Sequence, residues 1–202
     1  MSADGLIKRK PRADGERNRL RIMAVAKEVF AEKGTSASLD EIAKVAGVGV
    51  GTLYRHFATR ETLIGQLYEN EGNQLVEAAQ ALMQNQAPAE ALRRWLLLFV
   101  EYLSTKRIMA EVLSLLGSDA DKICTVSADQ LVKACQALLD NARRDGSVRR
   151  EVMPLDLLFA ISGGAGRGYS QNWEQAATRL VDILLAGLAC EPCHRPLASD
   201  VR

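Results

Sequence analysis

The segment from Ser38 to Phe57, SLDEIAKVAGVGVGTLYRHF, constrains the fold most, because it holds the signals for two short helices and the turn between them. Ser38 and Glu41 have the S-x-x-E spacing of a capping box, in which the hydroxyl and the carboxylate accept from free backbone N–H groups at a helix start. Gly47 ends this helix, and a second helix begins near Val50. The pattern therefore predicts a helix-turn-helix.

The apolar residues of this segment have helical spacing. Ile42, Ala43 and Ala46 fall on one face of the first helix, and small alanines allow a second helix to approach closely. Leu53 and Phe57 are four residues apart in the second helix, so both should be buried. We expect these five side chains to form the contact between the two helices.

The other face of the second helix suits DNA. Val50, Gly51 and Thr52 are short, so the backbone could approach the base edges of a major groove. The hydroxyl of Tyr54 and the imidazole of His56 can donate to phosphate oxygens, although either residue could instead belong to the core. The predicted DNA-binding residues are Ser38, Val50, Gly51, Thr52, Tyr54, Arg55, His56 and Arg60.

The charge distribution favours the same function. Residues 1–60 hold 12 Lys and Arg against 7 Asp and Glu, a net charge of +5, whereas the rest of the chain has a net charge of −4. A basic N-terminal part on an acidic protein is suited to binding phosphates. The basic run KRKPR at 8–12 lies in a polar stretch, 1–15, that we expect to be disordered, and it could serve either as a minor-groove arm or as a solvated tail.

The remaining pattern predicts an all-α protein. The chain is 48% hydrophobic but only 5% aromatic, is rich in Ala and Leu, and has no alternating strand pattern. Proline and glycine mark several helix ends, such as Gly34, Gly117, Gly146 and Pro154. The helices predicted outside the helix-turn-helix span 14–33, 59–85, 90–105, 107–116, 127–144, 154–161 and 171–190.

Four quoted segments together resemble the TetR family of bacterial transcription regulators. They are FAEKG at 30–34, LDEIAKVAGV at 39–48, GTLYRHF at 51–57 and TRETL at 59–63, and they cover about the first third of the chain. The resemblance implies a three-helix DNA-binding domain over 1–58 and a helical effector-binding and dimerisation domain over 59–202. It also implies that Tyr54, His56 and Arg60 hold phosphates.

One residue departs from the family pattern. Members often have serine or threonine near position 49, where this chain has Gly49. Glycine is tolerated at an N-cap but has no hydroxyl, so one capping or phosphate contact should be missing.

The last helices predict a homodimer. Their apolar face is wider than one partner helix would cover, and pairing two helices from each chain would bury it in a four-helix interface. The predicted dimerisation residues are Leu158, Ile161, Leu180, Val181, Leu184 and Leu188.

The resemblance further implies a small-molecule effector, which we expect to be largely apolar. Trp95, Phe99, Tyr102 and Met109 recur near helical spacing and are the predicted ligand-binding residues, although such residues more often form plain core. The long helix predicted from Thr59 would connect this region to the DNA-binding domain.

Two further motifs have weaker functional readings. Cys190, Cys193 and His194 have the C-x-x-C-H spacing of a haem attachment site and are also possible zinc ligands, but no export signal or fourth ligand is evident, so we expect a loose tail. The glycines at 164–168 follow a helical pattern and lack the G-x-G-x-x-G spacing, which favours a flexible connection over a nucleotide-binding loop.

These observations predict a cytoplasmic, ligand-responsive transcription regulator without a cofactor or a membrane segment, most simply a repressor that binds a palindromic duplex operator. Catalysis has little support, because only two histidines are present and no nucleophile and base pair is evident. One alternative is a helical small-molecule-binding protein or enzyme with a degenerate helix-turn-helix. Another is a constitutive, ligand-independent DNA-binding or scaffolding protein.

Overall fold

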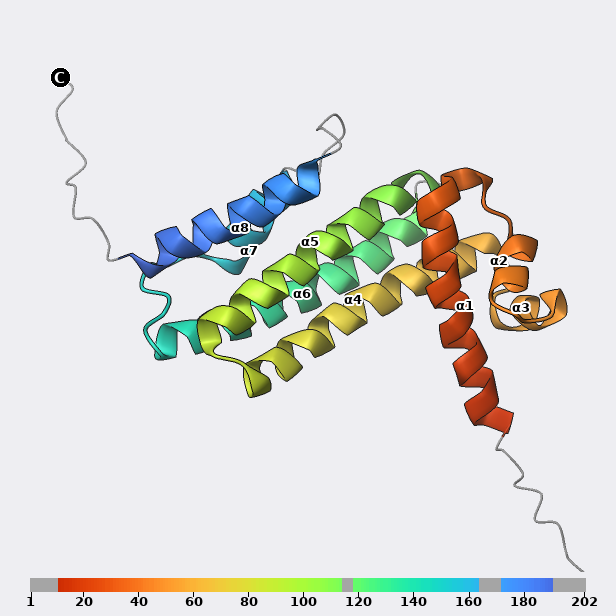
Figure 1. Cartoon of the computed structure of the whole chain (residues 1–202), viewed down its shortest axis with the longest axis horizontal. Coiled ribbons are helices and arrows are strands. Elements are labelled where there is room, and N and C mark those ends of the chain that lie inside the picture. The colour runs from red at the N-terminus through yellow and green to blue at the C-terminus, as the bar shows by residue number, and fades with distance from the viewer. Residues whose placement is uncertain (1–10, 114–117, 164–171, 191–202) are drawn as a thin grey trace, which may run out of the picture. The chain divides into compact units, whose positions relative to one another are not determined.

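The computed structural model describes residues 11–113, 118–163 and 172–190, with side chains described outside 11–13, 35 and 107–127. All regular structure in these ranges is helical, which confirms the all-α prediction (Figure 1). The elements are α1 (Pro11–Lys33), the 3-10 turn η1 (Gly34–Ser36), α2 (Leu39–Val45), α3 (Val50–His56), α4 (Arg60–Asn85), α5 (Pro88–Leu113), α6 (Ser118–Arg144), α7 (Pro154–Gly163) and α8 (Trp173–Ala189).

The chain divides into two compact units. The N-terminal unit holds the described residues up to Glu69 together with 108–113 and 118–121, and the C-terminal unit holds 70–107 with the described part of 122–190. Helix α4 therefore begins in the first unit and continues in the second. The predicted functional boundary after residue 58 stays a prediction.

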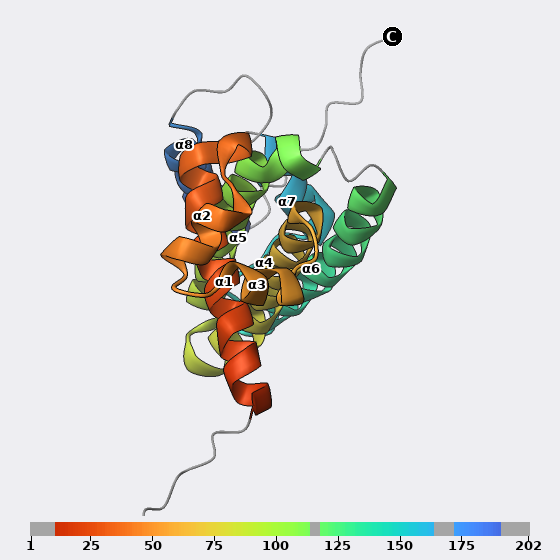
Figure 2. The same ribbon diagram turned by 90° about the vertical axis from the view of Figure 1, so that its right-hand side faces the viewer.

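Helices α1, α2 and α3 contact one another in the N-terminal unit (Figures 1 and 2). The five helix-turn-helix residues predicted to be buried are at most 3% exposed. The buried face of α1 holds Ile22, Met23, Ala26, Val29 and Phe30, whereas Leu20 and Ala24 face solvent. The first turns of α4 add Leu63, Ile64 and Leu67 to this core.

The turn between α2 and α3 is closed by backbone hydrogen bonds around Gly47. Gly47 N–H donates to Lys44 O at 3.1 Å, and Val48 N–H donates to Ala43 O at 3.0 Å. This pair of bonds is a Schellman motif, which needs a left-handed residue directly after the helix. Gly47 has φ +62°, a conformation that other residues adopt only at a cost. The prediction that Gly47 ends the helix is confirmed.

The C-terminal unit packs long helices side by side. In Figures 1 and 2 its parts of α4, α5 and α6 run alongside each other. The indole N–H of fully buried Trp95 donates to Leu75 O at 2.8 Å and so ties α5 to α4. Helix α8 lies along α5, where Arg93 Nε donates to Asp182 at 2.7 Å. This hydrogen bond lowers the pKa of Asp182 and raises that of Arg93.

Helix boundaries differ from the prediction by more than two residues in three places. Helix α1 begins at Pro11 instead of Asp14, so residues 11–15 are helical although we expected them to be disordered. Proline suits a first helical position because it needs no N–H partner there. The two helices predicted over 90–105 and 107–116 are one helix, α5. Helix α6 begins nine residues before Ser127, since no proline or glycine stops it. The glycine cluster at 164–168 lies outside the described residues.

The two glycines of the helix-turn-helix predict opposite effects on stability. A Cβ at Gly47 or at Gly51 would meet no atom within 4 Å, so only the backbone conformation distinguishes them. Gly47→Ala should lower the free energy of unfolding by about 1–2 kcal/mol, because alanine is strained at positive φ. Gly51→Ala should raise it by about 0.5–1 kcal/mol, because Gly51 lies inside helix α3. Thermal unfolding of both variants, followed by circular dichroism, checks this; equal shifts would contradict it.

Candidate nucleic-acid interface

Ser38 starts the helix-turn-helix. Its backbone is extended, and its Oγ accepts a hydrogen bond from Glu41 N–H at 3.2 Å, as the capping box predicts. The second half of that prediction is wrong, because the Glu41 carboxylate accepts from Lys33 Nζ at the end of α1. This hydrogen bond raises the pKa of the Lys33 ammonium group. Ser38 thus caps α2 itself, while the contact between Lys33 and Glu41 joins α2 to the end of α1.

Helix α3 presents an exposed face of short and polar residues. Val50 is 42% exposed and Tyr54 is 47% exposed, while Leu53 on the opposite side is fully buried. Gly51 is exposed with open space where its side chain would be, so nothing in the fold requires a glycine there. Thr52 is half-buried. The face could therefore be approached closely by another molecule.

The N-cap of α3 is Gly49, as the sequence predicts from the start at Val50. Its carbonyl accepts from Thr52 N–H at 2.8 Å and from Leu53 N–H at 3.1 Å, but no side chain caps the helix. Helix α3 therefore begins without a side-chain cap.

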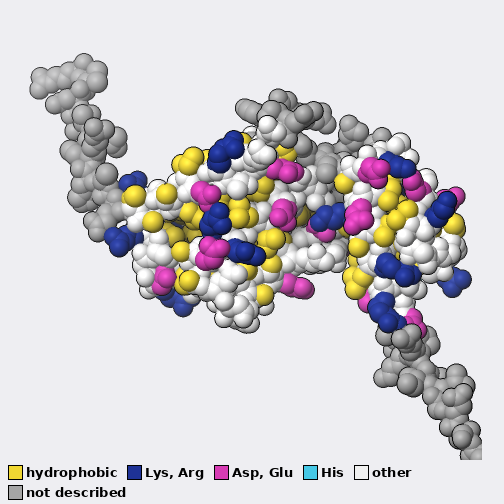
Figure 3. All heavy atoms as spheres, in the orientation of Figure 1, with side chains coloured by type: hydrophobic (Ala, Val, Ile, Leu, Met, Phe, Trp, Pro, Cys, Tyr) yellow, Lys and Arg dark blue, Asp and Glu magenta, His cyan; other side chains and the backbone are white. Residues whose placement is uncertain are grey.

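Three exposed cations surround this segment without an acidic partner among the described residues. Lys44 is in the last turn of α2, Arg55 is in the last turn of α3, and Arg21 of α1 donates to Gly47 O at 3.4 Å in the turn. Three other cations of the unit, Arg17, Arg19 and Lys33, are paired with acidic side chains. In Figure 3 basic and acidic side chains are mixed over the visible face of this part. Unpaired cations are the ones available to phosphate.

Two predicted phosphate-binding residues, His56 and Arg60, are less exposed than Tyr54. His56 is half-buried, and a Cβ at Gly15 of α1 would lie 3.9 Å from its Cε1. Arg60 is half-buried, its guanidinium donates to the carbonyls of Ala37 and Gly34, and it lies 5.0 Å from the Phe30 ring centroid. Sequence reasoning missed Lys44 and Arg21; their place on exposed faces beside the turn was the available signal.

The predicted ligand-binding residues form a packed aromatic row. Trp95, Phe99 and Tyr102 are at most 6% exposed, and their successive ring centroids lie 6.1 Å apart in stacked arrangement. The side chain of Met109 lies outside the described residues. A cavity of about 430 Å³ instead opens between α4 and α6, lined by Val76, Ala79, Gln80, Met83, Lys133 and Ala137 among others.

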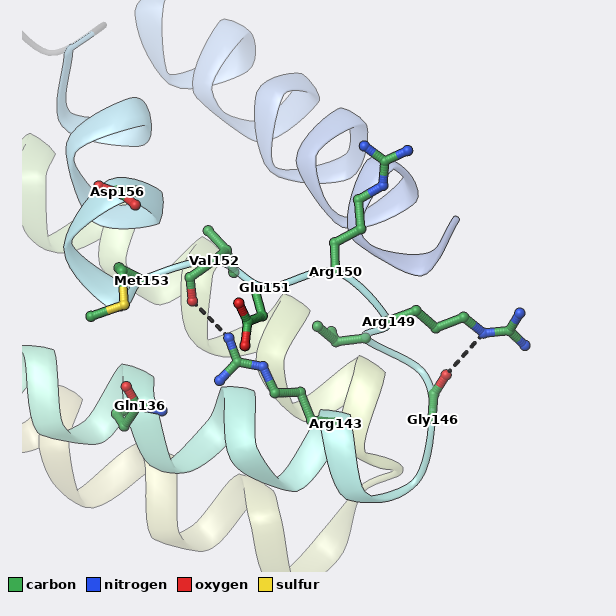
Figure 4. Close-up of a pocket in the computed structure, with 10 residues that line it drawn as sticks. Gln136, Arg143, Gly146, Arg149, Arg150, Glu151, Val152, Met153 and Asp156 are labelled. Atoms are coloured by element: carbon green, nitrogen blue, oxygen red, sulfur yellow. Dashed lines mark hydrogen bonds between the residues drawn. The ribbon is translucent and has the colours of Figure 1, made fainter. Parts of the chain in front are cut away.

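A larger cavity of about 750 Å³ lies between the end of α6 and the start of α7 (Figure 4). Arg143 donates to Val152 O at 2.7 Å across it. Arg149 donates to Gly146 O, and the guanidinium of Arg150 points elsewhere, toward α8. Because these three cations point in different directions, they do not form one anion site.

The predicted dimerisation residues fall into two groups. Four of them are buried within the chain, and Leu180 and Leu184 are half-buried. The large apolar side chains that this part of the chain leaves exposed are different, with Phe159 at 68% and Ile183 at 67%. The four buried residues are Leu158, Ile161, Val181 and Leu188.

Little in the described residues suggests a metal or catalytic site. No three His, Cys, Asp or Glu side chains gather there at metal-binding distances, and Cys193 and His194 of the predicted tail motif lie outside those residues. Burial raises the pKa of the Cys135 thiol to about 12, which suppresses thiolate chemistry. None of the described helices has both the length and the apolar character needed to cross a membrane.

Comparisons with known proteins agree with this architecture. The pattern of the bacterial regulatory proteins of the tetR family matches residues 22–67, and that of the SbtR-like transcriptional regulator C-terminal domain matches residues 87–190. A curated HTH-type transcriptional regulator of Staphylococcus aureus (strain USA300) is 45% identical over 53 residues, which are 26% of this chain. The match spans only 29% of that relative's length.

Solved structures extend the likeness over most of the chain. A TetR transcriptional regulator from Streptomyces coelicolor is 38% identical, with 84% of this chain and 97% of that chain covered and a TM-score of 0.76. A TetR regulatory protein from Mycobacterium vanbaalenii is 30% identical, with 89% and 99% covered and a TM-score of 0.73. The chain therefore belongs to the TetR family, a family of transcriptional regulators and not of enzymes.

Proposed function

We propose that this chain is a cytoplasmic repressor that binds a palindromic operator in duplex DNA as a homodimer and leaves it when a small apolar effector binds. The exposed face of α3 carries the proposal, because Val50 and Tyr54 are solvent-exposed there and Gly51 is a helical glycine without a packing reason. A glycine that weakens a helix is understandable where a DNA backbone or base edge must come close.

The cations and the exposed face of α3 would have different roles in DNA binding. Lys44, Arg55 and Arg21 would contact phosphates, and each contact releases a counterion from DNA. Val50 and Thr52 would meet base edges and thymine methyl groups, which gives sequence preference. Tyr54 would donate its hydroxyl to a phosphate.

Gly51→Ala should separate DNA binding from stability. The variant should be more stable than the wild type and yet bind the operator more weakly, since its methyl group would stand on the face that approaches DNA. The operator is first recovered by selection from random duplex DNA. An affinity that rises with stability would refute the assignment of α3 as the recognition helix.

Charge variants test the phosphate contacts. Lys44→Gln and Arg55→Gln should each reduce the slope of log affinity against log salt by about 0.9, whereas Tyr54→Phe should weaken binding about tenfold on all sequences. Arg144→Gln, an exposed arginine in α6, is the matched control and should change neither quantity. Unchanged slopes in both charge variants would contradict the proposed interface.

The dimer would form through α7 and α8. Phe159 and Leu155 are four residues apart on α7 and are exposed, as is Ile183 on α8. Leu180 and Leu184, both half-buried, can add to the same contact. Exposed apolar side chains of this size on adjacent helices suit an isologous interface, and two-fold symmetry would place two recognition helices on half-sites about 34 Å apart.

Phe159→Glu should give monomers with much weaker operator binding, because it buries an unpaired charge in the interface while leaving the fold intact. Sedimentation at micromolar concentration measures the oligomeric state. Val45→Glu places the same charge at another exposed apolar position, on α2, and should remain dimeric. A monomeric wild type, or a dimeric Phe159→Glu variant, would exclude this interface.

The effector site is proposed in the cavity between α4 and α6. Its lining includes the apolar side chains of Val76, Ala79 and Met83 on α4 and the polar side chains of Lys133 and Gln80. Such a mixture suits a small molecule with an apolar body and one polar end. Trp95, Phe99 and Tyr102 are packed against each other and do not line this cavity.

A screen of small apolar compounds by thermal shift should yield a ligand whose effect is lost in Ala137→Phe, which fills the cavity from its exposed side. Release of DNA by about 100-fold requires about 2.7 kcal/mol of coupling, and operator DNA must weaken ligand binding by the same factor. Titrations with and without operator measure this. Equal ligand affinities would refute the proposed induction, and a shift that persists in Ala137→Phe would place the ligand elsewhere.

A further inference from the structure

Arg60, the first residue of α4, is held inside the N-terminal unit. Its Nη2 donates to Gly34 O at 3.2 Å and its Nη1 donates to Ala37 O. Its guanidinium also lies over the ring of Phe30, 5.0 Å from the centroid, and that ring is 2% exposed. The guanidinium therefore has three contacts within its own unit.

The two carbonyls belong to the connection that leads into α2. Gly34 and Ala37 are the first residue of η1 and the residue directly after it, and Ala37 precedes Ser38, the N-cap of α2. Gly34 has φ +57°, so this connection turns sharply. A guanidinium can donate to two carbonyls in different directions because its N–H groups form a planar fork, whereas a lysine ammonium acts as a point charge.

We propose that Arg60 is a positioning residue that fastens the start of α4 to the start of α2, and that its partners during DNA binding remain these carbonyls and not a phosphate. A phosphate contact would require the guanidinium to give up two charge-assisted hydrogen bonds and its place over Phe30. The inference rests on the proposed DNA-binding function and gives that function a connection through which α4 holds the recognition segment in place.

A neighbouring arginine provides a matched comparison. Arg19 of α1 donates to Gln66 Oε1 of α4 through Nε at 3.3 Å and Nη2 at 3.1 Å. This contact also joins α4 to another helix of the same unit, but it does not touch the connection into α2. Loss of either arginine should loosen α4, and only loss of Arg60 should also free the start of α2.

The test compares Arg60→Lys, Arg60→Gln and Arg19→Lys in the full chain, with duplex DNA recovered by selection. Both Arg60 variants should bind about tenfold more weakly with an unchanged salt slope, because orientation is lost and no phosphate contact is removed. Hydrogen exchange of the free protein should accelerate at residues 38–42 in both Arg60 variants. Arg19→Lys should leave DNA affinity and this exchange unchanged.

Three results would overturn the proposal. A phosphate contact predicts near wild-type affinity for Arg60→Lys and a slope reduced by about 0.9 for Arg60→Gln. A general structural role predicts that Arg19→Lys weakens DNA binding as much as Arg60→Lys does. If hydrogen exchange at residues 38–42 is unchanged in Arg60→Lys, the positioning role of Arg60 is excluded. This measurement uses the free protein, so it is independent of whether the wild type binds DNA.

Discussion

The left-handed turn at Gly47 is the constraint on which the helix-turn-helix depends. Its positive φ lets the N–H groups of Gly47 and Val48 donate to the carbonyls of Lys44 and Ala43. These carbonyls at the end of α2 therefore gain hydrogen bonds within two residues of the helix end. Gly49 can then begin α3 at once, which turns Leu53 toward the buried side and Val50 and Tyr54 toward solvent. The orientation of the candidate recognition face follows from that single backbone conformation.

The basic residues of the N-terminal unit differ in role although they look alike in sequence. Arg19 and Arg60 join helices through an amide oxygen and backbone carbonyls, and Lys33 pairs with Glu41. Lys44 and Arg55 have no such partner among the described residues and remain available to a polyanion at little cost. A count of positive charges therefore overstates the charge that this unit can offer to DNA.

The C-terminal unit shows the same distinction among apolar residues. Val181 and Leu188 look suited to an interface in sequence, but the chain buries them itself, while Phe159 and Ile183 are left in solvent. The aromatic row from Trp95 to Tyr102 is likewise packed, with the Trp95 indole fixed to a backbone carbonyl, and the cavity opens beside other residues. Helical spacing identifies an apolar face but not what covers it.

Features that depend on residues close together in the chain can be predicted from the sequence. Examples are the cap at Ser38, the end of α2 at Gly47 and the start of α7 at Pro154. They are predictable because a helix end is decided by hydrogen bonds within about four residues. The family motifs are likewise short runs of neighbouring residues. Three other features could not be predicted: the partner of Arg60, the partner of Glu41 and the apolar side chains that α7 and α8 leave exposed. Those outcomes depend on which segments pack together, and a side chain is buried or paired by residues far from it in the chain.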